Sequence, residues 1–210
     1  MREYTTAYSR VGVPVRYAIC LLCSSFLFGL SPKLAAQDVD WRGVVLPGER
    51  KPTAYFPGLF AERTDTLTTA TGATPMRRYY FNDPEGLTGN RLYTLTVVDY
   101  PRGSVPADSS ARREAMFRET VDAAVESVAG TLLFASAKEQ SRYPGYVFRV
   151  DYNEGTKSVY NEAYFVGDRY YHLQVFALKR DGGTKSRARF FDNFRPSPPP
   201  ATEAEASRRG

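Results

Sequence analysis

The sequence predicts an α+β fold, in which a central antiparallel sheet of about six to seven strands is flanked by helices. Short segments of alternating apolar and polar residues recur between residues 59 and 178, and a period of two is typical of half-buried strands. Two other segments, 108–130 and 185–195, carry apolar residues at helical spacing. Tight turns join successive strands in the second half, which favours antiparallel pairing.

The first part of the domain predicts a hairpin and then a single strand. Asp38–Pro57 is rich in proline and glycine, so we expect it to be irregular. Leu59–Thr71 and Thr74–Asn82 flank a glycine-containing turn and predict the two strands of a hairpin. Arg91–Tyr100 predicts a further strand, whose apolar side consists of Tyr93, Leu95 and Val97.

The strongest helix signal lies at Asp108–Gly130. Asp108 or Ser109 can cap the first turn, and Gly130 is expected to close the helix in the left-handed conformation. Charged residues of both signs cover the remaining surface, which favours a solvated face over a docking patch. The apolar stripe comprises Phe117, Val121, Ala124, Val125, Val128 and Leu132.

The second half predicts four strands and a short helix. A turn at Tyr143–Gly145 follows the first of these strands, and the loop Gly167-Asp168 joins the last two as a tight hairpin. The strands are expected at Thr131–Glu139, Tyr146–Tyr152, Ser158–Val166 and Arg169–Leu178, the last with an apolar row of Tyr171, Leu173, Val175 and Ala177. The helix is expected at Lys185–Arg195, docked by Phe190, Phe191 and Phe194.

The two ends of the chain are expected to lie outside a single domain at 37–195. Residues 1–36 are typical of a signal peptide, because arginines precede an apolar run at Tyr17–Leu30 that is too short to cross a membrane. Cleavage is expected after Ala36, with a buried helix or an uncleaved anchor as alternatives. Residues 196–210 lack large apolar side chains and are expected to be a disordered tail. The domain is therefore expected in the periplasm or outside the cell.

The composition argues against several function classes. The chain has 28 basic and 23 acidic residues, and residues 1–36 account for +3 of the net charge of +5, so the domain lacks the basic excess of a nucleic-acid binder. Cys20 and Cys23 both lie in the apolar run, which leaves the exported domain without a disulfide, thiolate ligand or cysteine nucleophile. No glycine-rich phosphate loop occurs. We expect no cofactor and no metal, and membrane contact only through the leader before cleavage.

Catalytic groups are sparse. His172 is the only histidine, it lies within a predicted strand, and no Gly-x-Ser-x-Gly motif presents a serine, so we expect a structural imidazole and no catalytic residue. The acids from Asp151 to Glu162 have the spacing of a calcium loop, but Thr156 occupies the required glycine position, which favours a hairpin turn. The alternative function is a secreted hydrolase or sugar-acting enzyme that uses strand and turn carboxylates. Its acids would come from Asp99, Asp151, Glu162 and Asp168.

The chain has 15 tyrosines, many of them on predicted strands. Tyrosine suits half-buried strand positions, and exposed tyrosines also make good binding surfaces. If Tyr171 faces the core, Tyr170 and His172 face away from it, and cross-strand pairing is expected to bring Tyr160 and Tyr164 to the same face. A helix could equally cover that face. These four residues are the candidate partner-binding surface.

The order of elements resembles the Mog1/PsbP-like superfamily over about residues 53–195. The strand ending in Asp99-Tyr100-Pro101, the Tyr164–Tyr171 hairpin and the closing Arg189–Phe194 segment carry this resemblance. It implies an α/β/α sandwich, and members that act as binding or assembly subunits rather than enzymes. We therefore expect an exported, non-catalytic binding or assembly domain whose partner is an unidentified protein, peptide or glycan.

Overall fold

The computed structural model describes residues 39–48, 51–69, 72–105, 110–140 and 143–196. The leader expected at 1–36 and nearly all of the tail expected at 196–210 lie outside these ranges. Within the described ranges, none of the helices combines the length and the apolar character needed to span a bilayer.

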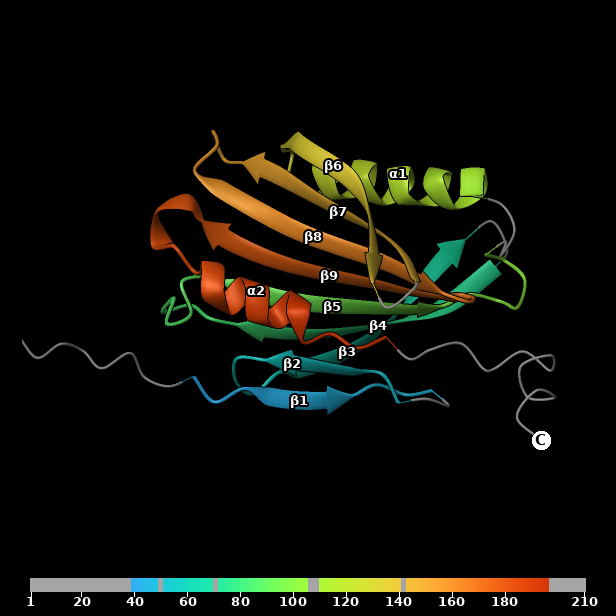
Figure 1. Cartoon of the computed structure of the whole chain (residues 1–210), viewed down its shortest axis with the longest axis horizontal. Helices are drawn as coiled ribbons and strands as arrows, with labels where there is room; N and C mark the ends of the chain where they lie inside the picture. The colour runs from blue at the N-terminus through green and yellow to red at the C-terminus, as the bar shows by residue number, and fades with distance from the viewer. Residues whose placement is uncertain (1–38, 49–50, 70–71, 106–109, 141–142, 197–210) are drawn as a thin grey trace, which may run out of the picture. The chain divides into compact units, whose positions relative to one another are not determined.

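Seven strands form one antiparallel sheet in the order β3-β4-β5-β9-β8-β7-β6 (Figure 1). The predicted α+β class is confirmed. Most neighbours are also consecutive in the chain, but β9 returns to pair with β5 and so joins the two halves of the sheet. The strands are β3 (Ala61–Thr69), β4 (Gly72–Asn82), β5 (Leu92–Asp99), β6 (Thr131–Gln140), β7 (Tyr143–Tyr152), β8 (Lys157–Val166) and β9 (Arg169–Leu178).

A two-stranded sheet precedes the main one and consists of β1 (Arg42–Val45) and β2 (Thr53–Phe56). The sequence predicted an irregular segment here, which is wrong for these two strands. Pro47, Gly48 and Pro52 lie between the two strands, and Pro57 and Gly58 follow the second. The buried side chains Val44, Ala54 and Phe56 anchor the pair to the core.

The two faces of the main sheet carry separate apolar clusters. On the α2 face, β1, β2 and α2 (Thr184–Asp192) pack over the apolar rows of β5 and β9. On the α1 face, α1 (Ser110–Ser127) packs over β7, β8 and β9. The predicted apolar row of β9 and the three docking phenylalanines of the α2 region are all buried, as expected.

The end of α1 differs from the prediction. Its closing left-handed residue is Ala129, with φ of 47°, and Gly130 does not have positive φ. Gly130 is needed for space instead, because a Cβ there would lie 2.5 Å from Val150 Cγ1 and 2.8 Å from the carbonyl oxygen of Asp151. The close approach of the α1–β6 connection to β7 therefore explains this glycine. Leu132, assigned to the helical stripe, lies on β6 and is 40% exposed.

Candidate functional site

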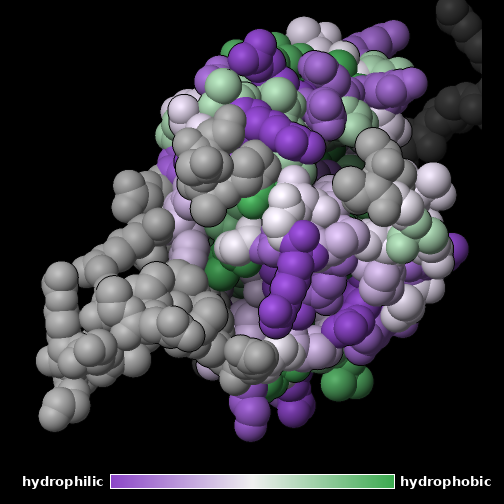
Figure 2. Space-filling model, turned by 90° about the vertical axis from the view of Figure 1, so that its right-hand side faces the viewer, coloured by the Kyte–Doolittle hydropathy of each residue, from purple (hydrophilic) through white to green (hydrophobic). Residues whose placement is uncertain are grey.

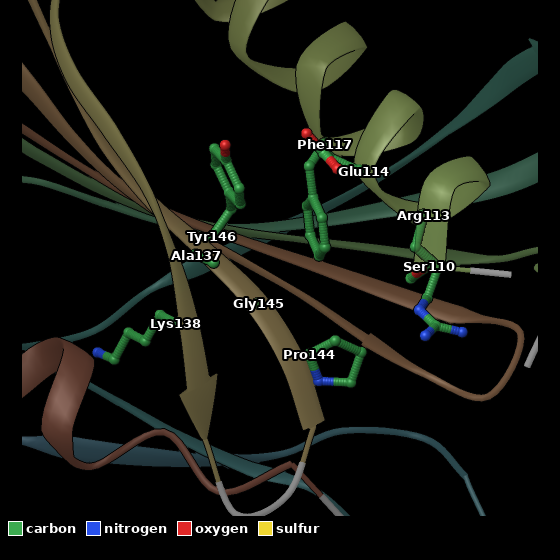
Figure 3. A pocket seen from close by; sticks show the side chains of 9 residues that line it. All are labelled: Ser110, Arg113, Glu114, Phe117, Ala137, Lys138, Pro144, Gly145 and Tyr146. Carbon is green, nitrogen blue, oxygen red and sulfur yellow. The ribbon is translucent and has the colours of Figure 1, made fainter. Parts of the chain in front are cut away.

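A groove lies between the first turns of α1 and the β6–β7 hairpin, and we call it the hairpin groove (Figure 3). Its volume is about 750 Å³. Phe117 points from α1 towards the sheet, and its ring stacks on that of Tyr146 with centroids 5.3 Å apart and planes 15° apart. Pro144 and Ala137 extend this apolar floor along the two strands.

The rim of the hairpin groove is polar. Ser110, Arg113 and Glu114 line it from α1, and hydrophilic side chains gather at the top of the view in Figure 2, at the height of α1 in Figure 1. Lys138 lines the groove from β6 but points away from Phe117, and its ammonium lies 2.6 Å from Glu162 Oε1. An apolar floor with a polar rim suits an amphipathic segment better than a small, fully charged ligand.

Glycine at position 145 allows close packing on the α2 face of β7, behind the groove. A Cβ at this position would lie 2.4 Å from Tyr164 Cδ1 and 2.8 Å from the carbonyl oxygen of Ala163. The ring of Tyr164 therefore packs directly against the β7 backbone on the α2 face. The turn predicted at Tyr143–Gly145 is instead the first part of β7. Residues 141–142, which precede β7 in the chain, lie outside the described ranges.

The free edge of β6 continues from this groove. Residues 131–137 are all exposed, and they include three consecutive large apolar side chains: Leu132 at 40%, Leu133 at 50% and Phe134 at 48%. A bulge interrupts the pairing with β7 between Leu132 and Phe134, and from Phe134 to Gln140 the register is regular. The opposite edge of the sheet, β3, is different, because its sequence AERTDTLTT is polar and charged.

The candidate surface predicted from the tyrosines does not form. Tyr164 pairs with Tyr171, and Tyr160 pairs with Val175, so both lie on the α2 face. Tyr170 and His172 lie on the α1 face, as their alternation with Tyr171 requires. The expectation that all four share one face is wrong. The tight turn after Val166 sets a register in which Tyr160 and Tyr164 lie on the same face as Tyr171, and therefore not on the face of Tyr170 and His172.

The three tyrosines of this set are engaged within the domain. Tyr164 is 1% exposed and its hydroxyl donates to Glu162, while Tyr170 is 8% exposed and its hydroxyl donates to Thr120 Oγ1 of α1. Burial, and after it the Glu162 charge, raises the pKa of Tyr164, and burial raises the pKa of Tyr170. Tyr160 is partly buried under the guanidinium of Arg187, whose Cζ lies 3.7 Å from the ring centroid.

The side chain of His172 belongs to a hydrogen-bond network of amide and hydroxyl side chains on the α1 face of the sheet. Its Nε2 lies 3.1 Å from Asn161 Oδ1, which also accepts from Gln174 Nε2 at 3.0 Å, and Thr94 Oγ1 donates to Gln174 Oε1. Burial, and after it the positive charge of Arg78, lowers the pKa of His172 to about 3. The imidazole is therefore neutral at physiological pH, and its hydrogen-bond partner is an amide oxygen rather than a carboxylate.

The acids that could form a hydrolase site each have a local partner. Asp99 pairs with Arg169, and Glu162 accepts from both Lys138 and Tyr164. Asp151 lies 2.5 Å from Lys179 Nζ, 2.9 Å from Arg149 Nε and 2.7 Å from Ser158 Oγ. The last acid, Asp168, accepts the backbone N–H groups of Gly103 and Val105.

The pKa of Asp151 indicates how these acids are used. Burial acts to raise it, but hydrogen bonds from Lys179, Ser158 and Arg149 outweigh burial and lower the pKa below its ordinary value. A general acid needs the opposite shift. Asn153, Glu154 and Gly155, between the acids of the calcium-like spacing, all have positive φ, as in a tight turn between β7 and β8. Within the described ranges, no group of three or more histidine, cysteine or acidic side chains is placed to hold a metal ion.

The sequence reasoning missed both the hairpin groove and the β6 edge. Three large apolar residues in a row at 132–134 were a usable signal, because a strand with one buried face alternates and this one does not. Which strand lies at the edge, however, depends on pairing between distant segments.

No family model matches this chain, and no curated protein matches its sequence. Among solved structures, the chain is similar to the solution structure of cyanobacterial PsbP from Synechocystis sp. PCC 6803. The identity is 10%, the TM-score is 0.48, and the match covers 75% of this chain and 92% of that one. This likeness concerns the fold alone.

Proposed function

We propose that this chain is an exported, non-catalytic binding domain that takes up an extended segment of a partner protein along the free edge of β6. The observation that carries the proposal is the contrast between the two sheet edges. Exposed edge strands invite pairing with other chains, and proteins usually protect them with charged side chains. The β3 edge carries Glu62, Arg63 and Asp65, whereas β6 exposes Leu132, Leu133 and Phe134.

The geometry of β6 suits strand addition. Its regular stretch from Phe134 to Gln140 offers roughly 20 Å of backbone for pairing. In this mode main-chain hydrogen bonds provide affinity, and pockets for alternate side chains provide specificity. The hairpin groove adjoins the same strand through Ala137, so an apolar side chain of the bound segment can reach Phe117 and Tyr146 while its neighbours contact the polar rim.

The chemistry of the described residues supports binding rather than turnover. The only histidine is held neutral and hydrogen-bonded inside the sheet. The strand and turn acids that could act in hydrolysis form ion pairs or, for Asp168, accept hydrogen bonds from loop backbone N–H groups. Export rests on the signal-like pattern of residues 1–36.

Site-specific photo-cross-linking tests this proposal. A photoreactive amino acid is placed at Ser136 of β6 or, as the matched control, at Thr66 of β3, and the full chain is expressed in its own organism. Both positions are exposed and lie near the middle of an edge strand. We expect a discrete protein adduct from Ser136 alone, in the extracytoplasmic fraction, and competition by excess purified protein.

A second variant makes the competition specific. Excess protein that carries Leu133→Glu and Phe134→Lys should fail to compete, because like β3 it presents a charged edge. Equal adducts from both positions, or no adduct from Ser136, would refute strand addition at β6. An adduct confined to the cytoplasm would refute export.

A further inference from the structure

A second groove lies on the α1 face of the sheet, over β3, β4, β5 and β9, and shares no lining residue with the hairpin groove. We call it the arginine groove. Its volume is about 310 Å³, which is at the lower end for small-molecule sites. Its lining residues are Arg63, Arg78, Tyr80, Leu92, Thr94, Gln174 and Phe176.

Two arginines stand directly opposite each other in this groove. The register of β3 and β4 pairs Arg63 with Arg78. Like charges at directly opposed positions destabilise a sheet, so an anion bound between them would relieve the repulsion. Arg63 Nε donates to Asp65 Oδ1 at 2.8 Å, but within the described ranges no acid or carbonyl pairs with Arg78. Arg78 is only partly exposed, which makes its uncompensated charge more costly than that of a fully solvated arginine.

The floor of the groove offers a neutral donor. Gln174 Nε2 gives one N–H to Asn161 Oδ1 at 3.0 Å, and its Oε1 accepts from Thr94. A side-chain amide has two N–H groups, so one remains for a ligand oxygen. His172 also contacts Asn161 Oδ1 in this network, but it is neutral and so adds no charge to the site.

The other end of the groove is apolar. Leu92 of β5 lies opposite Phe176 of β9, and Tyr80 of β4 is 37% exposed beside them. These side chains offer a platform for the body of a ligand, whereas the arginines offer planar donors that match a carboxylate in bidentate fashion.

We propose that the arginine groove binds a small organic acid, with its carboxylate between Arg63 and Arg78 and its apolar body on Tyr80, Leu92 and Phe176. Neither a simple inorganic anion nor an uncharged aromatic compound uses both halves of the groove. The carboxylate could belong to a free acid or to the carboxyl terminus of a peptide, which have this chemistry in common.

The test is a titration of the purified full chain, followed by NMR and by thermal melting. Benzoate is the main probe, benzamide is its uncharged counterpart, phosphate lacks the apolar body, and N-acetylphenylalanine mimics a peptide terminus. We expect benzoate or N-acetylphenylalanine to shift signals of Arg78, Tyr80 and Phe176 with a Kd in the low millimolar range. Benzamide and phosphate should bind at least tenfold more weakly. The tighter of the two carboxylates identifies the source.

Two neighbouring arginines provide matched variants. Arg78→Gln should weaken benzoate binding about tenfold or more, because it removes a charge-assisted contact. Arg77→Gln removes the same charge from the other face of β4 and should leave the Kd within about twofold. Without ligand, Arg78→Gln should also raise the Tm by about 1–3 °C through relief of the like-charge pair.

Several outcomes would overturn the inference. If phosphate bound as tightly as benzoate, the apolar platform would not contribute to binding. If benzamide bound as tightly as benzoate, the arginines would not recognise the carboxylate. Equal losses in Arg77→Gln and Arg78→Gln would indicate a general charge effect. A lower Tm in Arg78→Gln without ligand would assign Arg78 a structural role. None of these outcomes concerns the β6 edge. A negative result here would therefore leave the proposal of strand addition at β6 unaffected, and a negative cross-linking result would leave the arginine groove unaffected.

Discussion

Lowering the pH should destabilise the domain through His172, because the folded state holds this imidazole neutral. Its pKa is lowered to about 3 in the folded state, while an unfolded histidine titrates near 6.5. Between these two values the unfolded state binds a proton that the folded state does not, so the free energy of unfolding falls as the pH falls. The loss begins near pH 6.5 and is complete near pH 3.

The magnitude follows from the shift. Each pH unit below 6.5 costs about 1.4 kcal/mol, so the change from pH 7.5 to pH 4.5 removes roughly 2.7 kcal/mol. Aspartates such as Asp151, which titrate near 3.8 in the unfolded chain, contribute only about 0.1 kcal/mol each by pH 4.5 and so interfere little. A domain of ordinary stability has about 5–15 kcal/mol in total, which makes the effect of His172 easy to measure.

Urea unfolding at pH 7.5, 6.5, 5.5 and 4.5 measures this effect. The urea midpoint of the unmodified protein should fall by about 1–2 M over this range. His172→Gln keeps a donor for Asn161 and cannot titrate, so its midpoint should be nearly flat with pH, whatever its stability at pH 7.5. A flat profile for the unmodified protein, or an equally steep one for His172→Gln, would show that His172 is not held neutral.

Three further substitutions test the packing of the site. Phe117→Ala removes the side chain that joins α1 to Tyr146 and should cost about 3–5 kcal/mol in urea unfolding; a cost below about 1 kcal/mol would mean that α1 is not anchored there. Asp168→Ala removes the acceptor of two backbone N–H groups, at 2.9 and 3.0 Å, and should cost about 1–2 kcal/mol with faster amide exchange in the 101–105 loop. Gly145→Ala places a Cβ against the Tyr164 ring and should cost about 1–3 kcal/mol; an unchanged Tm would contradict the close approach.

The local elements of this fold could be predicted because each has a local cause. The apolar row of β9 alternates with a period of two, and burial of one face requires that pattern. Gly167, with φ of 60°, permits the two-residue turn that was expected from the sequence. By contrast, β1 and β2 are too short to show a period, and they form because Phe56 and Val44 pack into the core.

The error over the tyrosine surface had a local cause too. In an antiparallel pair, the numbers of opposed residues have a constant sum, so Val166 opposite Arg169 already places Tyr164 opposite Tyr171. The turn alone therefore contained the correct register. The grooves are different, because they depend on pairing between segments far apart in the chain. No local pattern indicates that β5 pairs with β9, which brings Thr94 beside Gln174.

Binding energy can come only from groups that the folded domain has not already satisfied. Glu162 and Asp151, each 8% exposed at the side chain, are fully engaged by lysine, arginine and hydroxyl donors, so a ligand that approached them would have to break existing contacts. In the part of the chain that the structure describes, the apolar edge of β6 and the charge of Arg78 are not engaged in this way. They differ in chemistry, lie on different strands at different parts of the sheet, and call for different ligands, one a polypeptide strand and the other an organic anion. A protein that binds through both can respond to a small acid without using its β6 edge, and substitutions at the two sites should therefore act additively.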